Sequence, residues 1–119
     1  MATSMREPTF WILTALVDRP RHGYGVMREA ETLSAGQVRL QTGTLYAALD
    51  RLTAEGLLEI DHEEIVDGRP RRYYRLTEAG AAALTAESER LARNAGTASR
   101  RLRARGFVTG RGPAAVTAG

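Results

Sequence analysis

The sequence contains no cysteine, and its only histidines are His22 and His62. Without cysteine the chain can form neither a disulfide bond nor a thiolate metal site. Two histidines are too few for a histidine-based zinc site without carboxylate ligands, so we expect no metal and no cofactor. Lysine is absent as well: all 17 basic residues are arginine, against 14 acidic residues and a formal net charge of +3. Arginine suits phosphate because its planar fork donates two parallel hydrogen bonds, although a biased genome composition would give the same count.

Long apolar runs and catalytic patterns are missing too. Residues 1–8 contain no apolar core of a signal peptide, and no stretch approaches the roughly 20 apolar residues of a membrane-spanning helix. We therefore expect a cytoplasmic protein without membrane contact. We find no nucleophile paired with a base, no paired acids and no phosphate-binding loop, and Gly23-Tyr24-Gly25 is too short for a nucleotide fingerprint. The sequence does not indicate an enzyme.

Three helices are predicted in the first half of the chain. Residues 1–7 lack periodicity and are expected to be mobile, and Pro8 begins a helix that runs to about residue 18. A second helix begins at His22 and is followed by a short extended piece over residues 38–40.

The third helix is expected from about residue 42 to residue 55. Threonine is expected to cap it, because a threonine hydroxyl can accept a hydrogen bond from a free amide of the first turn. Leu45, Leu49 and Leu52 recur at spacings of four and three, so these leucines should face the core.

A β-hairpin follows, with strands over residues 58–63 and 71–76 and a turn at Asp67-Gly68. Burial of one face fixes the register, which is expected to pair Ile60 with Tyr74, Glu59 with Arg75 and Glu63 with Arg71. This register requires a loop of odd length, longer than a tight two-residue turn. It also leaves Arg69 and Arg72 as the freer charges of the hairpin.

The last helix is predicted over residues 78–105, with Thr77-Glu78 at its start. At 1.5 Å per residue it is roughly 40 Å long, which is more than a small core can cover. Small and apolar residues recur along it at alternating spacings of three and four, which is typical of a seam between two helices. Residues 106–119 are expected to form a disordered tail.

These elements predict a mainly α fold with a small β-hairpin. Residues 8–77 would form a winged helix-turn-helix domain, and residues 78–105 a dimerisation helix. The third helix is short enough, and exposed enough on one side, to enter a DNA major groove about 12 Å wide.

Several strings of the sequence resemble the PadR family of bacterial transcriptional regulators. They are Leu13-Thr14-Ala15-Leu16, Arg21-His22-Gly23-Tyr24-Gly25, Gly43-Thr44-Leu45-Tyr46, Glu55-Gly56-Leu57 and Arg71-Arg72-Tyr73-Tyr74-Arg75-Leu76-Thr77-Glu78-Ala79-Gly80. They occur in order and at the right separations, and the similarity covers about residues 8–104. The single C-terminal helix resembles the short subfamily.

The resemblance implies a homodimer that represses a double-stranded operator with two-fold symmetry and is released by a small, commonly aromatic effector. The long helix would pack against the partner's first helix. The residues expected at this interface are Phe10, Trp11, Leu84, Leu91, Ala95, Ala98 and Leu102. Drug-binding members of the short subfamily carry a tryptophan on the long helix, whereas residues 78–105 contain no aromatic residue. Trp11 is therefore the residue expected to border an effector pocket.

The predicted DNA-binding residues lie at three places. They are His22 and Tyr24 at the start of the second helix, Thr42, Thr44, Tyr46, Ala47 and Arg51 on the third helix, and Arg69 and Arg72 at the wing. We expect Thr44 and Ala47 to approach base edges and Tyr46 and Arg51 to bind phosphates. A helix start is a ready anion site, and the wing arginines would reach the flanking minor groove or backbone.

Each of these residues also has a structural alternative. Thr44 and His22 could cap helices, Tyr46 could border the core, and the wing arginines could form an ordinary solvated loop. Asp50 could pair with an arginine or accept a hydrogen bond from cytosine. The alternative function is a winged-helix protein-interaction module without DNA binding.

Overall fold

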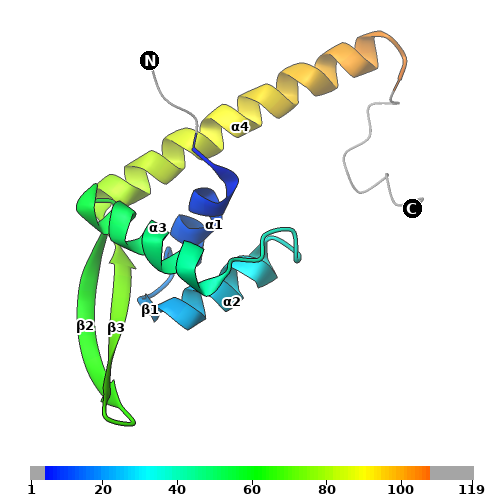
Figure 1. Cartoon of the computed structure of the whole chain (residues 1–119). Helices are drawn as coiled ribbons and strands as arrows, with labels where there is room; N and C mark the ends of the chain where they lie inside the picture. Colours follow the sequence, from blue (N-terminus) through cyan, green and yellow to red (C-terminus); the bar gives the residue numbers. More distant parts are fainter. Residues whose placement is uncertain (1–4, 108–119) are drawn as a thin grey trace. The chain divides into compact units, whose positions relative to one another are not determined.

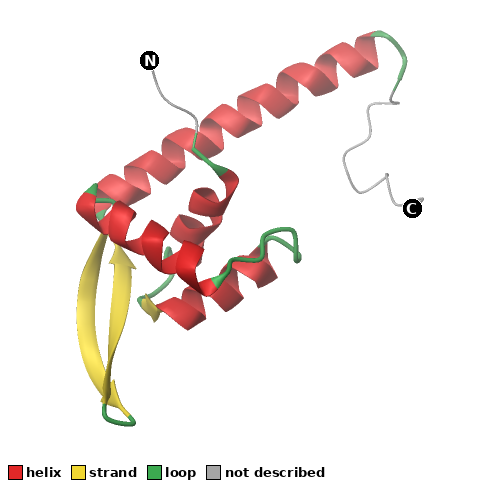
Figure 2. Cartoon of the chain, in the orientation of Figure 1, coloured by secondary structure: helices red, strands yellow, loops and turns green. Residues whose placement is uncertain are grey.

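The computed structural model describes residues 5–107 and contains seven elements in this range (Figures 1 and 2). They are α1 Glu7–Ala15, β1 Arg21–His22, α2 Gly23–Leu33, α3 Thr42–Ala54, β2 Leu58–Val66, β3 Arg69–Leu76 and α4 Glu78–Ala104. The chain divides into two compact units, Met1–Glu87 and Ser88–Gly119, and α4 crosses their boundary. Within residues 5–107, no helix is both long and apolar enough to cross a membrane. The predicted tail lies almost wholly outside the described residues.

The first unit is a winged helix-turn-helix, which confirms the predicted fold class. Three helices precede a hairpin that projects away from them (Figure 1). The sheet is antiparallel and has the strand order β1-β3-β2, so the short first strand lies beside the second strand of the hairpin.

The core lies between the helices and the base of the hairpin. The three leucines of α3 predicted to face inward, Leu45, Leu49 and Leu52, are fully buried. Residues from α1, α2 and the hairpin complete the core, among them Ile12, Leu13, Val26, Leu58 and Tyr74. Met5 packs against this core as well, and α1 begins at Glu7, so ordered structure is already present before Pro8.

The strand that accompanies the hairpin lies at a different place in the sequence than predicted. Residues 38–40 form no strand, because the Val38 amide donates to the Ser34 hydroxyl at 3.0 Å and the Val38 side chain is buried. The third strand of the sheet is instead β1, which follows Pro20. Residues 21–22 are free to form it because α1 already ends at Ala15 and Pro20 disfavours helix at the residue before it.

Capping also differs between the helices. Gln41 precedes α3 and makes no side-chain capping bond, so the expected threonine cap of α3 is wrong. Thr77 does cap α4, since its Oγ1 accepts a hydrogen bond from the Gly80 amide at 2.9 Å.

The hairpin confirms the register near its base and corrects it near its tip. Ile60 faces Tyr74 and Glu59 faces Arg75, as predicted. The register then shifts between Ile60 and His62, because a bulge, and not the loop, takes up the odd residue. The strands therefore end at a two-residue turn in which Asp67 and Gly68 have φ values of 52° and 76°. As a result, the partner of Glu63 is Arg72, and Arg71 faces Glu64.

Two glycines of α4 should respond in opposite ways to substitution by alanine. A Cβ at Gly80 would collide with the Leu57 carbonyl oxygen and lie 2.7 Å from Leu76 Cδ1, whereas a Cβ at Gly96 would meet only the end of Arg100, at 3.2 Å. We expect Gly80→Ala to lower the free energy of unfolding by about 1–3 kcal/mol. Gly96→Ala should raise it by up to about 1 kcal/mol, the usual gain of alanine over glycine in a helix. Urea denaturation of both variants checks this, and stabilisation by Gly80→Ala would contradict it.

Candidate nucleic-acid interface

A groove of about 620 Å³ lies between the start of α2, one flank of α3 and the hairpin. Four of the predicted DNA-binding residues line it: His22, Tyr24, Tyr46 and Arg72. Asp50, Glu63, Pro70, Arg71 and Tyr74 complete its wall. The groove therefore brings together the three places that the sequence pointed to separately.

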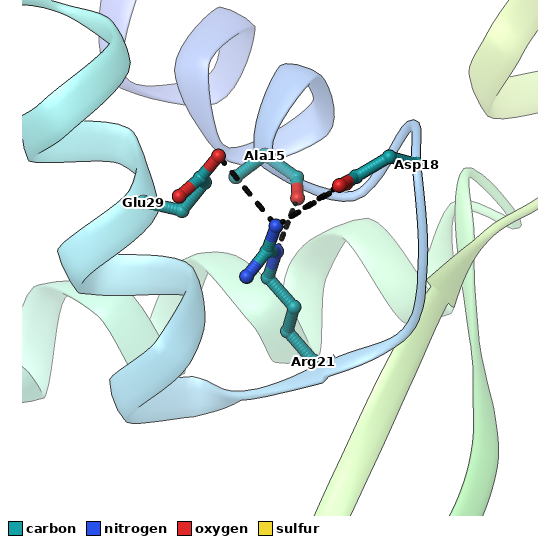
Figure 3. A network of polar contacts seen from close by, with 4 residues as sticks. All are labelled: Ala15, Asp18, Arg21 and Glu29. Carbon is teal, nitrogen blue, oxygen red and sulfur yellow. Dashed lines mark hydrogen bonds and ion pairs between the residues drawn. The ribbon is translucent and has the colours of Figure 1, made fainter.

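Arg21 holds the start of α2 in position. Its Nε donates to the Ala15 carbonyl at 2.8 Å, and its Nη2 lies 3.2 Å from Asp18 and 3.5 Å from Glu29. Figure 3 shows the guanidinium between the end of α1 and α2. The side chain is only 12% exposed, so Arg21 is a structural residue with little surface left for a ligand.

The backbone of the same segment holds the wing. Arg21 pairs with Tyr74 and His22 pairs with Tyr73 in the antiparallel ladder of β1 and β3. Since His22 is also the N-cap of α2, the start of α2 lies directly beside the inner strand of the hairpin.

Gly23 allows α2 and α3 to approach each other closely. A Cβ at this position would lie 2.6 Å from Cζ of Tyr46, which is closer than real contacts permit. The absence of a side chain at Gly23 therefore lets the Tyr46 ring lie against the first turn of α2. Tyr46 remains 43% exposed and Tyr24 56% exposed.

His22 caps α2 through its side chain. Its Nδ1 accepts a hydrogen bond from the Gly25 amide at 3.2 Å, which requires the ring nitrogen to be unprotonated. Partial burial, followed by the charge of Arg71, lowers the pKa of His22. The capping alternative for His22 is thus realised, and a role in DNA binding stays a prediction.

His62 has the opposite electrostatic environment. It stacks on Tyr73 with ring centroids 4.3 Å apart, and its Nδ1 lies 2.6 Å from the Asp61 carboxylate. The hydrogen bond to Asp61 raises the pKa of His62. The His22 ring meets the same Tyr73 in a T-shaped arrangement, with ring centroids 5.3 Å apart.

The exposed face of α3 carries the remaining candidates of that helix. Thr42, Thr44 and Ala47 are exposed. With about 100° between successive residues, Tyr46 and Arg51 lie on opposite flanks, with Ala47 between them. Arg51 lies outside the groove wall. Its Nη2 donates to Thr9 Oγ1 at 3.1 Å, and its Nη1 lies 3.6 Å from Glu55.

The arginines of the wing are not equivalent. Arg72 Nε donates to Glu63 at 3.1 Å, so the expectation that Arg72 is one of the freer charges is wrong. Arg69 is exposed at the start of β3, and Arg71 lines the groove. Asp50 also lines the groove, and no ion pair joins it to an arginine within residues 5–107.

The sequence interpretation missed two arginines near these residues. The pattern of the hairpin pairs Arg71 with Glu63, whereas in the structure Arg71 faces Glu64 and lines the groove. The guanidinium carbon of Arg28 lies 5.7 Å from the centre of the Tyr24 ring. The spacing of four residues between Tyr24 and Arg28 on one helix is the signal that could have found it.

The residues expected at a dimer interface lie on α1 and α4. Phe10 and Trp11 are half-buried and meet edge to face with centroids 5.1 Å apart, while Trp11 Nε1 donates to Glu7 at 3.4 Å. Leu84 packs against the core. In the second unit, Leu91 and Leu102 are exposed by 41% and 44%, and Ala95 and Ala98 are also exposed. Among the described residues, no group of three or more histidine, aspartate or glutamate side chains could hold a metal ion.

Comparisons with family models and with known proteins agree on one family. A family model described as the transcriptional regulator PadR-like family matches residues 12–86, more than half of the chain. The transcriptional regulator Rv3488 of Mycobacterium tuberculosis is 46% identical over 80 residues, which cover 67% of this chain and 71% of that protein.

Two solved structures extend this comparison. A PadR-like transcription factor from Bacteroides fragilis has a TM-score of 0.67 and 26% identity, covering 78% of this chain and 87% of that one. PadR of Bacillus subtilis in complex with operator DNA has a TM-score of 0.60 and 22% identity, covering 67% of this chain and 45% of that one. The second similarity shows the fold.

The two histidines should titrate on opposite sides of the ordinary histidine pKa of about 6.5. We expect a midpoint below this value for His22 and above it for His62, as measured by NMR of the ring protons. Because the unfolded chain binds a proton at His22 more readily than the folded chain, this residue lowers stability as the pH falls below about 6.5. His62 adds stability at low pH, which is lost as the pH rises through its folded pKa, so unfolding should be measured in a His62→Gln background. The same midpoint for both rings in the folded protein would contradict the structure.

Proposed function

Since the chain belongs to the PadR-like family of transcriptional regulators, we propose that it represses transcription by binding operator DNA as a homodimer. In each subunit α3 enters the major groove, and the hairpin lies over the neighbouring backbone. The observation that carries this proposal is the exposed face of α3, bounded on one side by the hairpin and by the start of α2.

The dimensions of α3 suit a major groove. Its 13 residues span roughly 20 Å, and Gly43 and Ala47 leave the middle of its exposed face open. Ala47 can therefore approach base edges, where an alanine methyl group can contact a thymine methyl group, and Thr44 would approach them from the flank that it shares with Arg51. Tyr46 and Arg51, on opposite flanks, would each face one of the two phosphate backbones.

Further phosphate contacts would come from α2 and the wing. Tyr24 is exposed in the first turn of α2, where the free amides of a helix N-terminus favour an anion, and Arg28 is exposed one turn further on. Thr42 begins α3, and Arg69 is exposed at the start of β3. These contacts would orient the protein, while the face of α3 would read the bases.

The dimer is proposed to form through α4. Leu91 and Leu102 expose apolar side chains to water, and the small residues Ala95 and Ala98 between them allow another helix to approach closely. Burial of these residues against a second copy would remove apolar surface from water. Two copies of α3 would then meet successive turns of a palindromic duplex.

A carboxylate placed on the exposed face of α3 should abolish operator binding. We expect Ala47→Glu to weaken binding at least a hundredfold, because like charges brought together at an interface cost several kcal/mol. Ala86→Glu introduces the same change on an exposed position of α4 and should bind as the wild type does. Fluorescence anisotropy with duplexes selected from a random pool measures both, and native mass spectrometry should find two chains per duplex.

The salt dependence of binding and the behaviour of the two variants can contradict this proposal. The logarithm of the binding constant should fall with the logarithm of salt concentration by about 0.9 for each neutralised phosphate. Affinity that is flat with salt, or equal loss in both glutamate variants, would remove α3 from the interface. A chain that selects no duplex at all would favour the protein-interaction module.

We also propose that an aromatic effector regulates binding at a pocket beside Trp11. The support is a half-buried tryptophan next to Phe10 on a helix expected at the dimer interface. Trp11 is the only tryptophan, so a ligand that stacks nearby should quench or shift its fluorescence and lower operator affinity. A Trp11→Phe variant, which has no tryptophan, is the control for fluorescence changes that do not come from Trp11. Unchanged emission with a panel of aromatic acids and dyes at saturating concentration would argue that the chain binds DNA constitutively.

A further inference from the structure

The groove contains a charge pair that competes with the proposed ligand. Arg72 Nε donates to Glu63 Oε2 at 3.1 Å, and the two side chains are 50% and 46% exposed. Glu63 and the Tyr74 hydroxyl both raise the pKa of Arg72, and the hydrogen bond to Glu63 engages the Nε donor before any DNA arrives. Both members of the pair line the groove.

The same hairpin carries a second pair of similar chemistry outside this groove. Arg75 Nη2 lies 2.7 Å from Glu59 Oε2, with side-chain exposures of 52% and 47%. Neither residue lines the groove between α2, α3 and the hairpin. The two pairs join the same strands, β2 and β3, and thus provide a natural comparison between a pair inside the proposed interface and one outside it.

We propose that Glu63 limits the affinity of the chain for DNA, because its carboxylate occupies Arg72 until a phosphate is pressed against the same guanidinium. The inference rests on the proposed operator binding. A carboxylate and a phosphate offer arginine the same chemistry, two oxygens for a planar fork. Glu63 thus acts as an internal substitute for the DNA backbone.

A phosphate can displace Glu63 because a half-exposed ion pair contributes little free energy. The exchange still costs the free energy of the pair in every complex in which the wing touches DNA. Asp50, also in the groove wall, adds repulsion between the groove and the phosphates. Both carboxylates therefore lower affinity for DNA, on the operator at least as much as on other sequences.

The test compares Glu63→Gln with Glu59→Gln, each alone and in an Arg72→Ala background. Glutamine keeps the shape of the side chain and removes its charge. For Glu63→Gln we expect affinity for the selected operator to rise about twofold to fivefold, the range of an exposed ion pair, and affinity for a random duplex to rise by no more than that. Glu59→Gln should change neither affinity, and Arg72→Ala should abolish the gain.

Other outcomes overturn the inference. A similar rise for Glu59→Gln, or a rise that persists without Arg72, would mean a general charge effect. Weaker operator binding by Glu63→Gln would mean that Glu63 positions Arg72 for DNA and does not compete with it. Wild-type protein that prefers no duplex would remove the proposed function itself, whereas an operator affinity that Glu63→Gln leaves unchanged would reject only the role of Glu63.

Discussion

The geometry of the candidate interface depends on the two-residue strand β1. Its backbone pairs with β3, while the side chain of Arg21 reaches the end of α1, the following loop and α2. A charge with so little exposure is costly unless all its partners are in place. Because those partners come from separate segments, none of them can move far without leaving the guanidinium unpaired. The wing, the end of α1 and α2 are held together as a result.

This rigidity matters for recognition because ordering a flexible surface on binding costs free energy. Tyr46 is already placed by its contact with Gly23, and the first turn of α2 is already capped by His22. The free amides of that helix start therefore keep a fixed direction. An anion that meets this surface finds its donors in position, so more of the interaction free energy remains for discrimination between sequences.

Much of the fold could be predicted from the sequence because burial imposes periodicity. The spacing of Leu45, Leu49 and Leu52 identified α3 and its inward face, and alternation identified the base of the hairpin. Residues beyond the core were harder. A one-residue bulge at the strand surface leaves no mark in an alternating pattern, yet it reassigned Glu63 from Arg71 to Arg72. The two-residue strand β1 is too short to show a period of two, so no pattern in the sequence predicts that residues 21–22 pair with β3.

The charge of the groove bears on what kind of binder this surface can be. Its wall contains two arginines, Arg71 and Arg72, and two carboxylates, Asp50 and Glu63, so opposite charges balance there. A strongly positive groove would hold any duplex, and the large excess of nonspecific sites in a genome would then compete for the protein. A balanced groove gives up part of that general attraction. Affinity must then come from contacts that only a matching sequence completes, on the face of α3 that the wing and α2 leave open.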